Sequence, residues 1–136
     1  RSDVMVNNFV FNALKNKKLK LFEPHFRRNF IHVRDVVDCV LYTINNFNKM
    51  KNNIYNAGLI SANITKLQLA KLIKKQIKDL KLITIKGIKD PDQRNYFVSN
   101  EKLKKKGFKA KRDLSEGIEE LIKGFKVEGL QIKNNY

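Results

Sequence analysis

The sequence contains no tryptophan and only one cysteine, two prolines and six glycines among its 136 residues. Because Cys39 has no second cysteine to pair with, an intrachain disulfide framework is excluded, and a reducing cytoplasm is the expected compartment. The two histidines, His25 and His32, do not have the spacing of metal ligands, and no cluster of cysteine and histidine indicates zinc. The composition therefore predicts neither a disulfide scaffold nor a metal site.

Long apolar runs are also missing. No stretch approaches the roughly 18 consecutive apolar residues that a membrane-spanning helix needs, and residues 1–3 do not begin a signal peptide. Hydrophobic residues make up 42% and charged residues 31% of the chain, which is the balance of a soluble globular protein. We therefore predict one domain over residues 1–136, with a modest core and no membrane partner.

Acidic residues are scarce, since 13 of them face 29 lysines and arginines and leave a net charge of +16. Such a charge is typical of nucleic-acid-binding proteins. However, lysines far outnumber arginines and asparagine is abundant, as the codon usage of an AT-rich genome would produce. Dense lysine clusters occur only at residues 15–18 and 104–106, at expected helix ends. We interpret the charge as a solvated surface without a specific nucleic-acid partner, and keep a basic nucleic-acid-binding module as the alternative.

The spacing of apolar residues predicts a small mixed α/β lobe with about five helices and short strands. The expected helix caps are Asp3, Asp35, the capping box of Thr65 and Gln68, Ser99, and the pair of Asp113 and Glu116. The helix after Asp35 carries a wide apolar face of Val36, Val37, Val40, Leu41, Ile44 and Phe47. The expected strands are Leu19–Phe22, Asn29–Val33, Ile54–Gly58 and Leu82–Ile85, with Tyr96–Val98 as a strand or an extended loop.

Smaller features complete this prediction. Asn56 is expected to fix a turn at Gly58, and Gly107 is expected to end a helix in the left-handed conformation. His32 is interpreted as a satisfied strand residue and Cys39 as inert packing. The tail after Gly129 is expected to fray.

The segment Arg28–Val37 resembles a hallmark of the extended short-chain dehydrogenases/reductases, which reads roughly R-D-[FY]-[IV]-[HY]-V-x-D in members that act on nucleotide-sugars. Three further matches follow the family order. Leu19–Phe22 matches the preceding strand, and Ile54–Gly58 with Asn63 and Thr65 matches YN-x-G followed by N-x-T. The last match is D-x-R-x-Y with its terminal motif, formed by Asp92–Tyr96, Ser99, Lys102, Gly107 and Phe108. The resemblance covers residues 3–126. The chain departs from the pattern at Asn29, where aspartate is commoner, and at Glu23-Pro24, where a glycine is usual.

The resemblance implies the C-terminal, substrate-binding part of an NAD-dependent nucleotide-sugar epimerase or dehydratase, with NAD(P) as cofactor of the complete enzyme. Catalysis in that family needs a glycine-rich dinucleotide turn and a Tyr-x-x-x-Lys pair. The sequence has neither, because no tyrosine is followed by lysine four residues later. We therefore expect a fragment whose Rossmann half is its missing partner, and which by itself is inactive and binds no NAD. A free-standing nucleotide-sugar-binding domain is the other alternative.

The resemblance also assigns candidate substrate-binding residues. Arg28 and Arg94 match arginines that contact the diphosphate, which suits the planar fork of arginine. Lys20 and Phe22 match a strand that lines the nucleotide base, while Val6 and Asn7 lie on the helix that faces it. The competing interpretations are exposed charges for both arginines and a core position for Phe22. No catalytic residue is expected in this chain.

Overall fold

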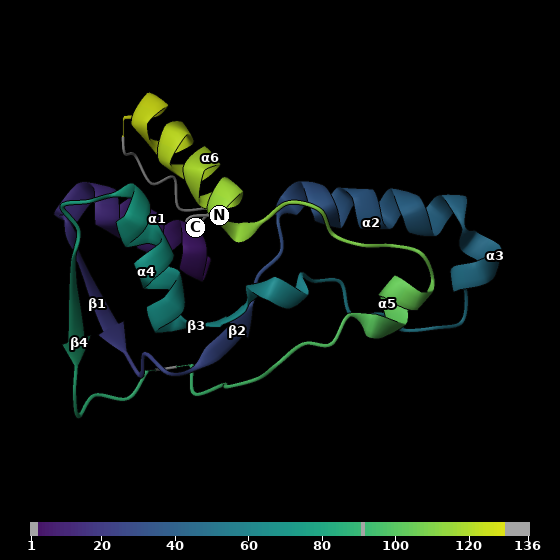
Figure 1. The fold of residues 1–136 in the computed structure, drawn as a ribbon, viewed down its shortest axis with the longest axis horizontal. Coiled ribbons are helices and arrows are strands. Elements are labelled where there is room, and N and C mark those ends of the chain that lie inside the picture. Colours follow the sequence, from purple (N-terminus) through teal and green to yellow (C-terminus); the bar gives the residue numbers. More distant parts are fainter. Residues whose placement is uncertain (1–2, 91, 130–136) are drawn as a thin grey trace. The chain divides into compact units, whose positions relative to one another are not determined.

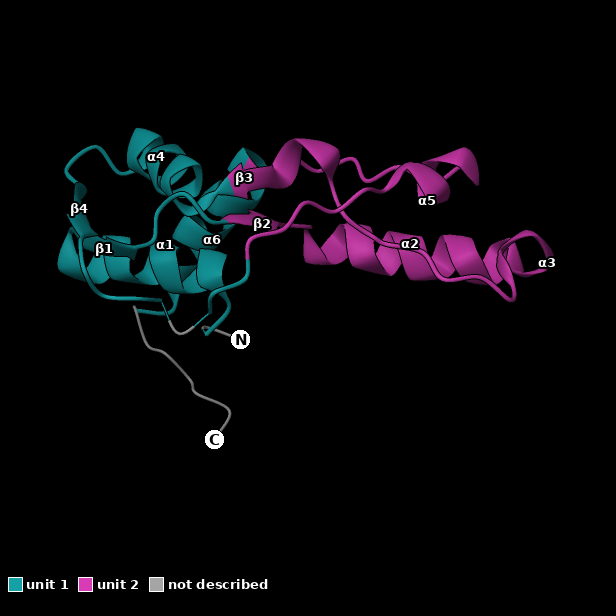
Figure 2. Ribbon diagram, turned by 90° about the horizontal axis from the view of Figure 1, so that it is seen from below, with its two compact units in different colours: residues 1–26, 65–94, 115–136 teal, residues 27–64, 95–114 magenta. Residues whose placement is uncertain are grey.

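The computed structural model describes residues 3–90 and 92–129, which form two compact units. Unit 1 comprises residues 1–26, 65–94 and 115–136, and unit 2 comprises residues 27–64 and 95–114 (Figure 2). The elements in chain order are α1 (Met5–Asn16), β1 (Lys18–Phe22), β2 (Arg27–Asn29), α2 (Val33–Asn45), α3 (Phe47–Met50), the 3-10 helix η1 (Ile60–Ala62), β3 (Asn63–Thr65), α4 (Lys66–Gln76), β4 (Lys81–Ile85), α5 (Glu101–Lys105) and α6 (Leu114–Val127). The predicted tail after Gly129 lies outside the described residues.

Unit 1 contains a parallel pair of strands, β1 and β4 (Figure 1). The register runs from Lys18 opposite Lys81 to Phe22 opposite Ile85. Leu19 and Leu21 are buried while Lys18 and Lys20 are exposed, which is the alternation of a strand with one covered face. Both predicted strands are therefore confirmed, and the structure adds that they pair.

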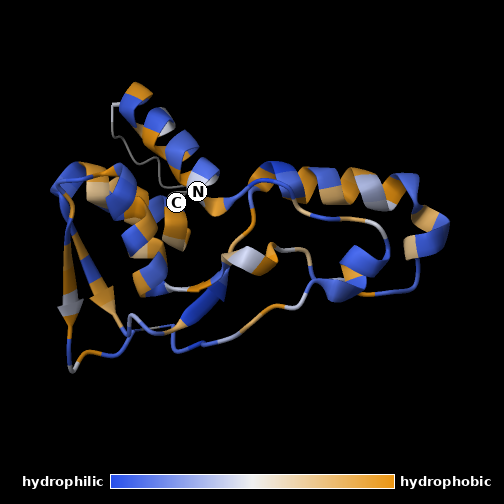
Figure 3. Cartoon of the chain, viewed as in Figure 1, coloured by the Kyte–Doolittle hydropathy of each residue, from blue (hydrophilic) through white to orange (hydrophobic). Residues whose placement is uncertain are grey.

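Three helices supply most of the remaining core of unit 1. Their apolar stripes are visible in Figure 3, and their buried residues are Val6, Val10, Phe11 and Ala13 on α1, Leu69, Ala70 and Ile73 on α4, and Ile118 and Ile122 on α6. The rings of Phe11 and Phe125 meet edge to face at 5.6 Å. Burying each large apolar side chain stabilises the fold by about 1.5–3 kcal/mol. The buried residues of each helix recur mainly at three- and four-residue spacing, as expected for one apolar face of a helix.

The helix starts agree only in part with the expected caps. Thr65 and Gln68 form the predicted capping box at α4. α1 begins one residue late, with Val4 at its N-cap position instead of Asp3. α2 is capped by His32, whose Nδ1 accepts a hydrogen bond from the backbone N–H of Arg34 at 3.2 Å. His32 is therefore satisfied as predicted, but as a helix cap and not within a strand.

Ser99 is likewise not the cap residue of its helix, because α5 has Asn100 at its N-cap position. The helix ends as expected at Gly107, whose φ of +103° lies in the left-handed region that glycine tolerates best. The N–H groups of Gly107 and Phe108 donate to the carbonyls of Lys104 and Leu103 and close the last turn.

In unit 2, β2 pairs with β3, whose first two residues also belong to that unit. β2 ends at Asn29, so the strand predicted over Asn29–Val33 is mostly wrong, because residues 30–32 are irregular and α2 begins at Val33. A small apolar cluster of Met50, Leu103 and Phe108 packs against Cys39, Tyr42 and Tyr55. Burial in this cluster raises the pKa of the Cys39 thiol, which agrees with its interpretation as inert packing.

Ile54–Gly58 does not form the expected strand or a turn. Gly58 has an ordinary φ, and it is required for a different reason. A Cβ at this position would lie 2.2 Å from Oδ1 of Asn29 and 2.7 Å from Nδ2 of Asn100. The glycine therefore allows two side chains to approach the backbone closely.

The segment Tyr96–Val98 is an extended loop, which was one of the two predicted forms. The side chain of Asn63 holds it through both groups of its amide, accepting from the N–H of Val98 at 2.8 Å and donating to its carbonyl at 3.0 Å. Asn56 donates to the carbonyl of Ser99 at 3.3 Å and does not fix a turn at Gly58. Amide side chains in unit 2 thus secure a long irregular segment.

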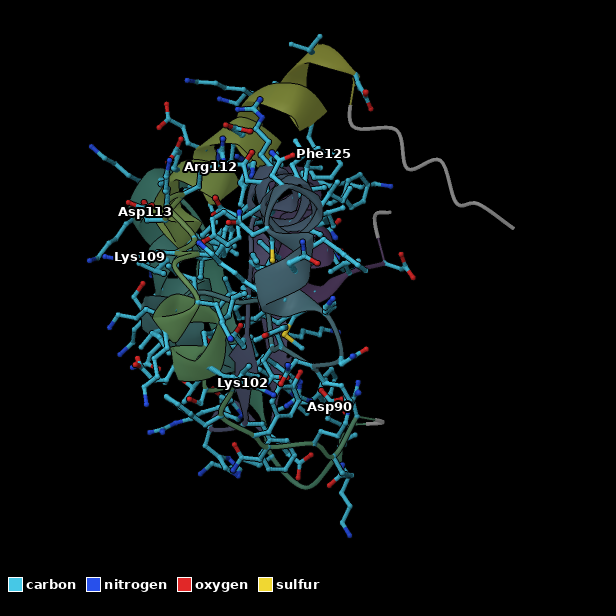
Figure 4. The ribbon with its side chains drawn as sticks, turned by 90° about the vertical axis from the view of Figure 1, so that its right-hand side faces the viewer. Asp90, Lys102, Lys109, Arg112, Asp113 and Phe125 are labelled. Atoms are coloured by element: carbon cyan, nitrogen blue, oxygen red, sulfur yellow. The ribbon has the colours of Figure 1, made fainter. Side chains whose placement is uncertain are left out.

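Asp35 is a buried anchor of unit 2 and not the predicted helix cap. Its side chain is 1% exposed, and its carboxylate accepts from the backbone N–H groups of Lys111 and Arg112 at 3.2 and 3.0 Å. Nη1 of Arg112, which is labelled in Figure 4, adds a third bond at 2.8 Å and also reaches Asp38 at 2.7 Å. The carboxylate thus joins α2 to the segment before α6.

We predict that Asp35→Asn lowers the free energy of unfolding by about 1.5–3 kcal/mol, the range for hydrogen bonds to a charged group. The amide keeps the shape of the side chain but brings an N–H toward three donors. Urea denaturation measures the loss. Asp38→Asn is the matched control and should cost about 0–1 kcal/mol, because Asp38 is half exposed; equal losses for both variants would contradict the anchor.

Candidate functional site

The outer face of β1 carries two of the predicted substrate-binding residues. Lys20 is exposed and Phe22 is half-buried, on the face opposite the two buried leucines. The register places Ile83 and Ile85 of β4 beside them. These four residues form a partly apolar surface, the β1–β4 face, on which a planar ring can lie. The sequence predicted both strands, but it did not reveal the isoleucines as neighbours, because only the pairing brings them there.

A buried lysine lies at the end of β1. Lys66, the first residue of α4, is 1% exposed. Its Nζ donates to the backbone carbonyl of Phe22 at 3.0 Å and forms an ion pair with Asp90 at 2.5 Å. The ammonium also lies 5.4 Å from the centre of the Phe26 ring. Lys66 therefore connects the end of β1 to a segment 24 positions further along the chain.

Glu23 makes a second connection to the same place. Its carboxylate accepts from the backbone N–H of Asp90 and from the side-chain amide of Gln93, both at 2.9 Å. Asp90, labelled in Figure 4, and residues 92–94 make up what we call the arginine segment, because it carries Arg94. Lys66 and Glu23 therefore both hold the arginine segment beside the end of β1. Sequence reasoning missed both residues, although Glu23-Pro24 was noted as a departure from the family pattern.

The carboxylate of Asp90 is kept ionised by these neighbours. Partial burial alone would raise the pKa of Asp90. The hydrogen bond and charge of Lys66, together with the N–H of Asp92, outweigh that effect and hold the pKa of Asp90 below its ordinary value. The carboxylate of Asp90 is therefore ionised at neutral pH, and the stability that it contributes is lost as the pH falls through its lowered pKa.

Arg94 is already engaged by a carboxylate of its own segment. Its Nε and Nη2 donate to the two carboxylate oxygens of Asp92 at 2.7 and 2.8 Å, while the arginine side chain is 73% exposed. This two-pronged geometry is the one that arginine offers to phosphate. The simplest diphosphate clamp would use an arginine without internal ion pairs. Arg94 is not such an arginine, because it is paired with Asp92. Arg94 can hold a phosphate only by exchanging or sharing the carboxylate of Asp92.

Arg28 lies in unit 2 and is only 4% exposed. Its Nη1 donates to the carbonyl of Arg27 at 2.8 Å, and its guanidinium lies 5.4 Å from the ring centre of Tyr96. The interpretation of Arg28 as an exposed charge at a strand end is therefore wrong. The contact joins the hallmark strand to the tyrosine of the D-x-R-x-Y segment.

The remaining candidates lie on α1. Val6 belongs to the core of unit 1, and Asn7 is half-buried. Unit 1 thus contains all but one of the six predicted substrate-binding residues, namely Val6, Asn7, Lys20, Phe22 and Arg94. The convergence of Arg28 on the same site as Arg94 stays a prediction, since the two belong to different units.

The described residues do not fit the pyrophosphate of NAD(P). That group binds where a strand leads through a glycine turn into the N-terminus of a helix. β1 leads to Glu23-Pro24, and β4 leads through Gly87 into a loop. At the other helix starts, the capping box of α4 uses its own N–H groups, and Asp35 places a buried carboxylate in the first turn of α2. No glycine turn of the required kind occurs over residues 3–90 and 92–129.

Two further features of the same part of the chain concern metal ligands and membrane-spanning helices. Among the described residues, no group of three or more histidine, cysteine, aspartate or glutamate side chains could hold a metal ion. None of the helices in this part combines the length and apolar character that crossing a membrane requires.

Comparison with known proteins relates this chain to one family. The profile of the NAD dependent epimerase/dehydratase family matches residues 2–58. GDP-L-colitose synthase of Yersinia pseudotuberculosis is 34% identical over 109 residues, which are 80% of this chain and 33% of that protein.

Solved structures show the same fold. UDP-glucose 4-epimerase from Thermotoga maritima, solved with UDP-glucose, has a TM-score of 0.72 and 25% identity, covering 90% of this chain and 39% of that one. An NAD-dependent NDP-hexosamine 5,6-dehydratase involved in tunicamycin biosynthesis has a TM-score of 0.76 at 17% identity, covering 93% of this chain and 41% of that one. These likenesses confirm a small mixed α/β structure that matches part of an epimerase/dehydratase fold.

Together, the family profile and the curated relative relate this chain to the NAD-dependent epimerase/dehydratase family of extended short-chain dehydrogenases/reductases. Members of this family use NAD(P) and bind nucleotide-sugars. The chain spans only 33% of its curated relative and 39–41% of the two solved structures.

Proposed function

We propose that this chain is the substrate-side part of an NAD(P)-dependent nucleotide-sugar epimerase or dehydratase, and that it binds the nucleotide diphosphate of the substrate. The observation that carries the proposal lies within unit 1, where Lys66 and Glu23 hold the arginine segment at the end of β1. These contacts support a phosphate-binding role for Arg94, because they tie its segment to Phe22 and Glu23 at the end of β1. A nucleotide needs both features, an accessible surface for its base and a cation for its phosphates.

Each candidate residue has a defined part in this proposal. Phe22, Ile83 and Ile85 offer apolar contact to the base, and Lys20 contributes charge at the edge of the same face. Arg94 and Arg28 hold the diphosphate. The redox chemistry of the family belongs to NAD(P), for which the described residues form no site. This part of the enzyme therefore contributes binding and orientation of the substrate.

The apolar face of α2 supports a further protein partner. The sequence predicted a wide apolar stripe on this helix, and Figure 3 shows apolar residues along α2. The side chains are 40–70% exposed: Val33, Val36, Val37, Val40, Leu41, Ile44 and Phe47, the last in α3. Exposed apolar patches of this kind mark protein interfaces. The relatives are much longer than this chain. We therefore infer that a part corresponding to their NAD(P)-binding part covers this face.

We predict that Arg28→Ala in the complete enzyme weakens nucleotide-sugar binding by about 1.5–3 kcal/mol, the range for a charge-assisted hydrogen bond. Arg94→Ala should weaken binding by an amount toward the lower end of this range, because Arg94 is exposed and is paired with Asp92. The double variant should be non-additive if both guanidinium groups touch one phosphate. Calorimetric titration with the nucleotide-sugar measures each effect.

The matched control is Arg27→Ala, since Arg27 is exposed on the same strand as Arg28. Arg112, which has no motif match, is not a neutral control, because it is bonded to Asp35 and Asp38. Equal weakening by the Arg27 and Arg28 variants would show a general charge effect and not a clamp.

We predict that the isolated chain neither binds NAD nor shows epimerase, dehydratase or reductase activity. The reason is the missing glycine turn together with the missing Tyr-x-x-x-Lys pair. Fluorescence titration with NADH is the measurement. Specific micromolar binding by residues 1–136 alone would overturn the assignment of this chain to the substrate side.

The proposed function makes a prediction that separates it from the alternative, a nucleic-acid-binding module. Association of the chain with RNA or DNA should be non-specific and fall steeply with salt, because scattered lysines act by releasing counterions. Filter binding over a salt series tests this. A sequence-specific complex that survives about 200 mM salt would favour the alternative.

A further inference from the structure

The end of β1 has a backbone conformation that its sequence does not favour. Glu23 has a φ of +44°, in the left-handed region where residues other than glycine are strained. The next residue, Pro24, restricts Glu23 further. A strained residue of this kind persists when its surroundings hold it, at a cost of about 1–3 kcal/mol. Glu23 is held by its two side-chain hydrogen bonds to the arginine segment and by a turn, in which its carbonyl accepts from the N–H of Phe26 at 3.1 Å.

Lys66 is also placed at an energetic cost. Removing an ammonium from water is expensive, and replacing a buried ion pair by apolar side chains of similar volume is often neutral or stabilising. Stability alone therefore does not explain a charged side chain that is 1% exposed. The geometry at its Nζ suggests a different reason for its presence.

Hydrogen bonds lead from Lys66 to Arg94 through two carboxylates. Lys66 donates to Oδ2 of Asp90, whose Oδ1 accepts from the backbone N–H of Asp92 at 2.8 Å. The carboxylate of Asp92 then accepts both prongs of the Arg94 guanidinium. The orientation of Arg94 therefore depends, link by link, on a buried group at the end of β1.

We propose that Lys66 and Glu23 are positioning residues that fix the arginine segment and thereby aim the guanidinium of Arg94 at a phosphate group of the bound nucleotide. The inference rests on the proposed function for the identity of the ligand. The tether itself rests only on contacts within unit 1. Neither residue touches the ligand; both act through Asp90 and the backbone of the arginine segment.

The test compares Lys66→Met with Lys71→Met in the complete enzyme. Met keeps the aliphatic length of Lys66 but removes its donors, and Lys71 is an exposed lysine on the same helix. We expect Lys66→Met to lower the melting temperature, because it leaves the carboxylate of Asp90 and the carbonyl of Phe22 without their donor. It should also speed amide hydrogen exchange in the arginine segment and weaken binding of uridine, guanosine or adenosine diphosphate roughly 3–30-fold. Lys71→Met should change none of these.

A double-mutant cycle separates positioning from a general structural role. If Lys66 acts through Arg94, Lys66→Met has no further effect on diphosphate affinity in the Arg94→Ala background. Additive losses would overturn the inference. Glu23→Gly supplies an independent variant, because glycine relieves the strained φ while removing the tether, so faster exchange of the arginine segment is expected without loss of fold.

The outcomes distinguish this inference from the proposed function. If Lys66→Met and Glu23→Gly leave exchange and affinity unchanged while Arg94→Ala weakens binding, the positioning role is wrong and the diphosphate site stands. If exchange accelerates but Arg94→Ala has no effect on any of the three diphosphates, the tether stands and the role of Arg94 in binding is wrong.

Discussion

The candidate site depends on a buried ion pair between Lys66 and Asp90. A lysine at the start of a helix could extend into water, yet this one is directed to the end of β1, where a backbone carbonyl and a carboxylate satisfy it. Because an unpaired ammonium in that position would be very costly, the arginine segment must remain where Asp90 meets it. The position of the segment that carries Arg94 therefore depends on the burial of the Lys66 ammonium.

Unit 2 uses a carboxylate in a comparable way. Asp35 is enclosed, and it holds the segment before α6 through backbone N–H groups and the guanidinium of Arg112. In both units, a buried charge helps to fix an irregular segment that regular strand pairing does not hold. Such anchors let a chain with short strands place loop residues accurately, which is what a binding site made from loops requires.

Local patterns in the sequence predicted the elements well and their ends poorly. The apolar stripes of α1, α4 and α6 follow from helical periodicity, and the capping box at Thr65 follows from local chemistry. The strand expected at Ile54–Gly58 did not form, because strand propensity has no effect without a neighbouring strand to pair with. Asp35 does not cap α2, because its carboxylate accepts hydrogen bonds from the distant N–H groups of Lys111 and Arg112 instead.

The sequence by itself determined the family resemblance, the helical faces and the absence of a glycine-rich dinucleotide turn, since each of these is a property of neighbours along the chain. Only the tertiary structure decided that Ile83 and Ile85 lie beside Lys20 and Phe22, and that Lys66 is bonded to Asp90 of the arginine segment. Those relations join residues that are far apart in sequence. Their physical basis is strand register and the satisfaction of a buried charge, and neither leaves a periodic signal in the sequence.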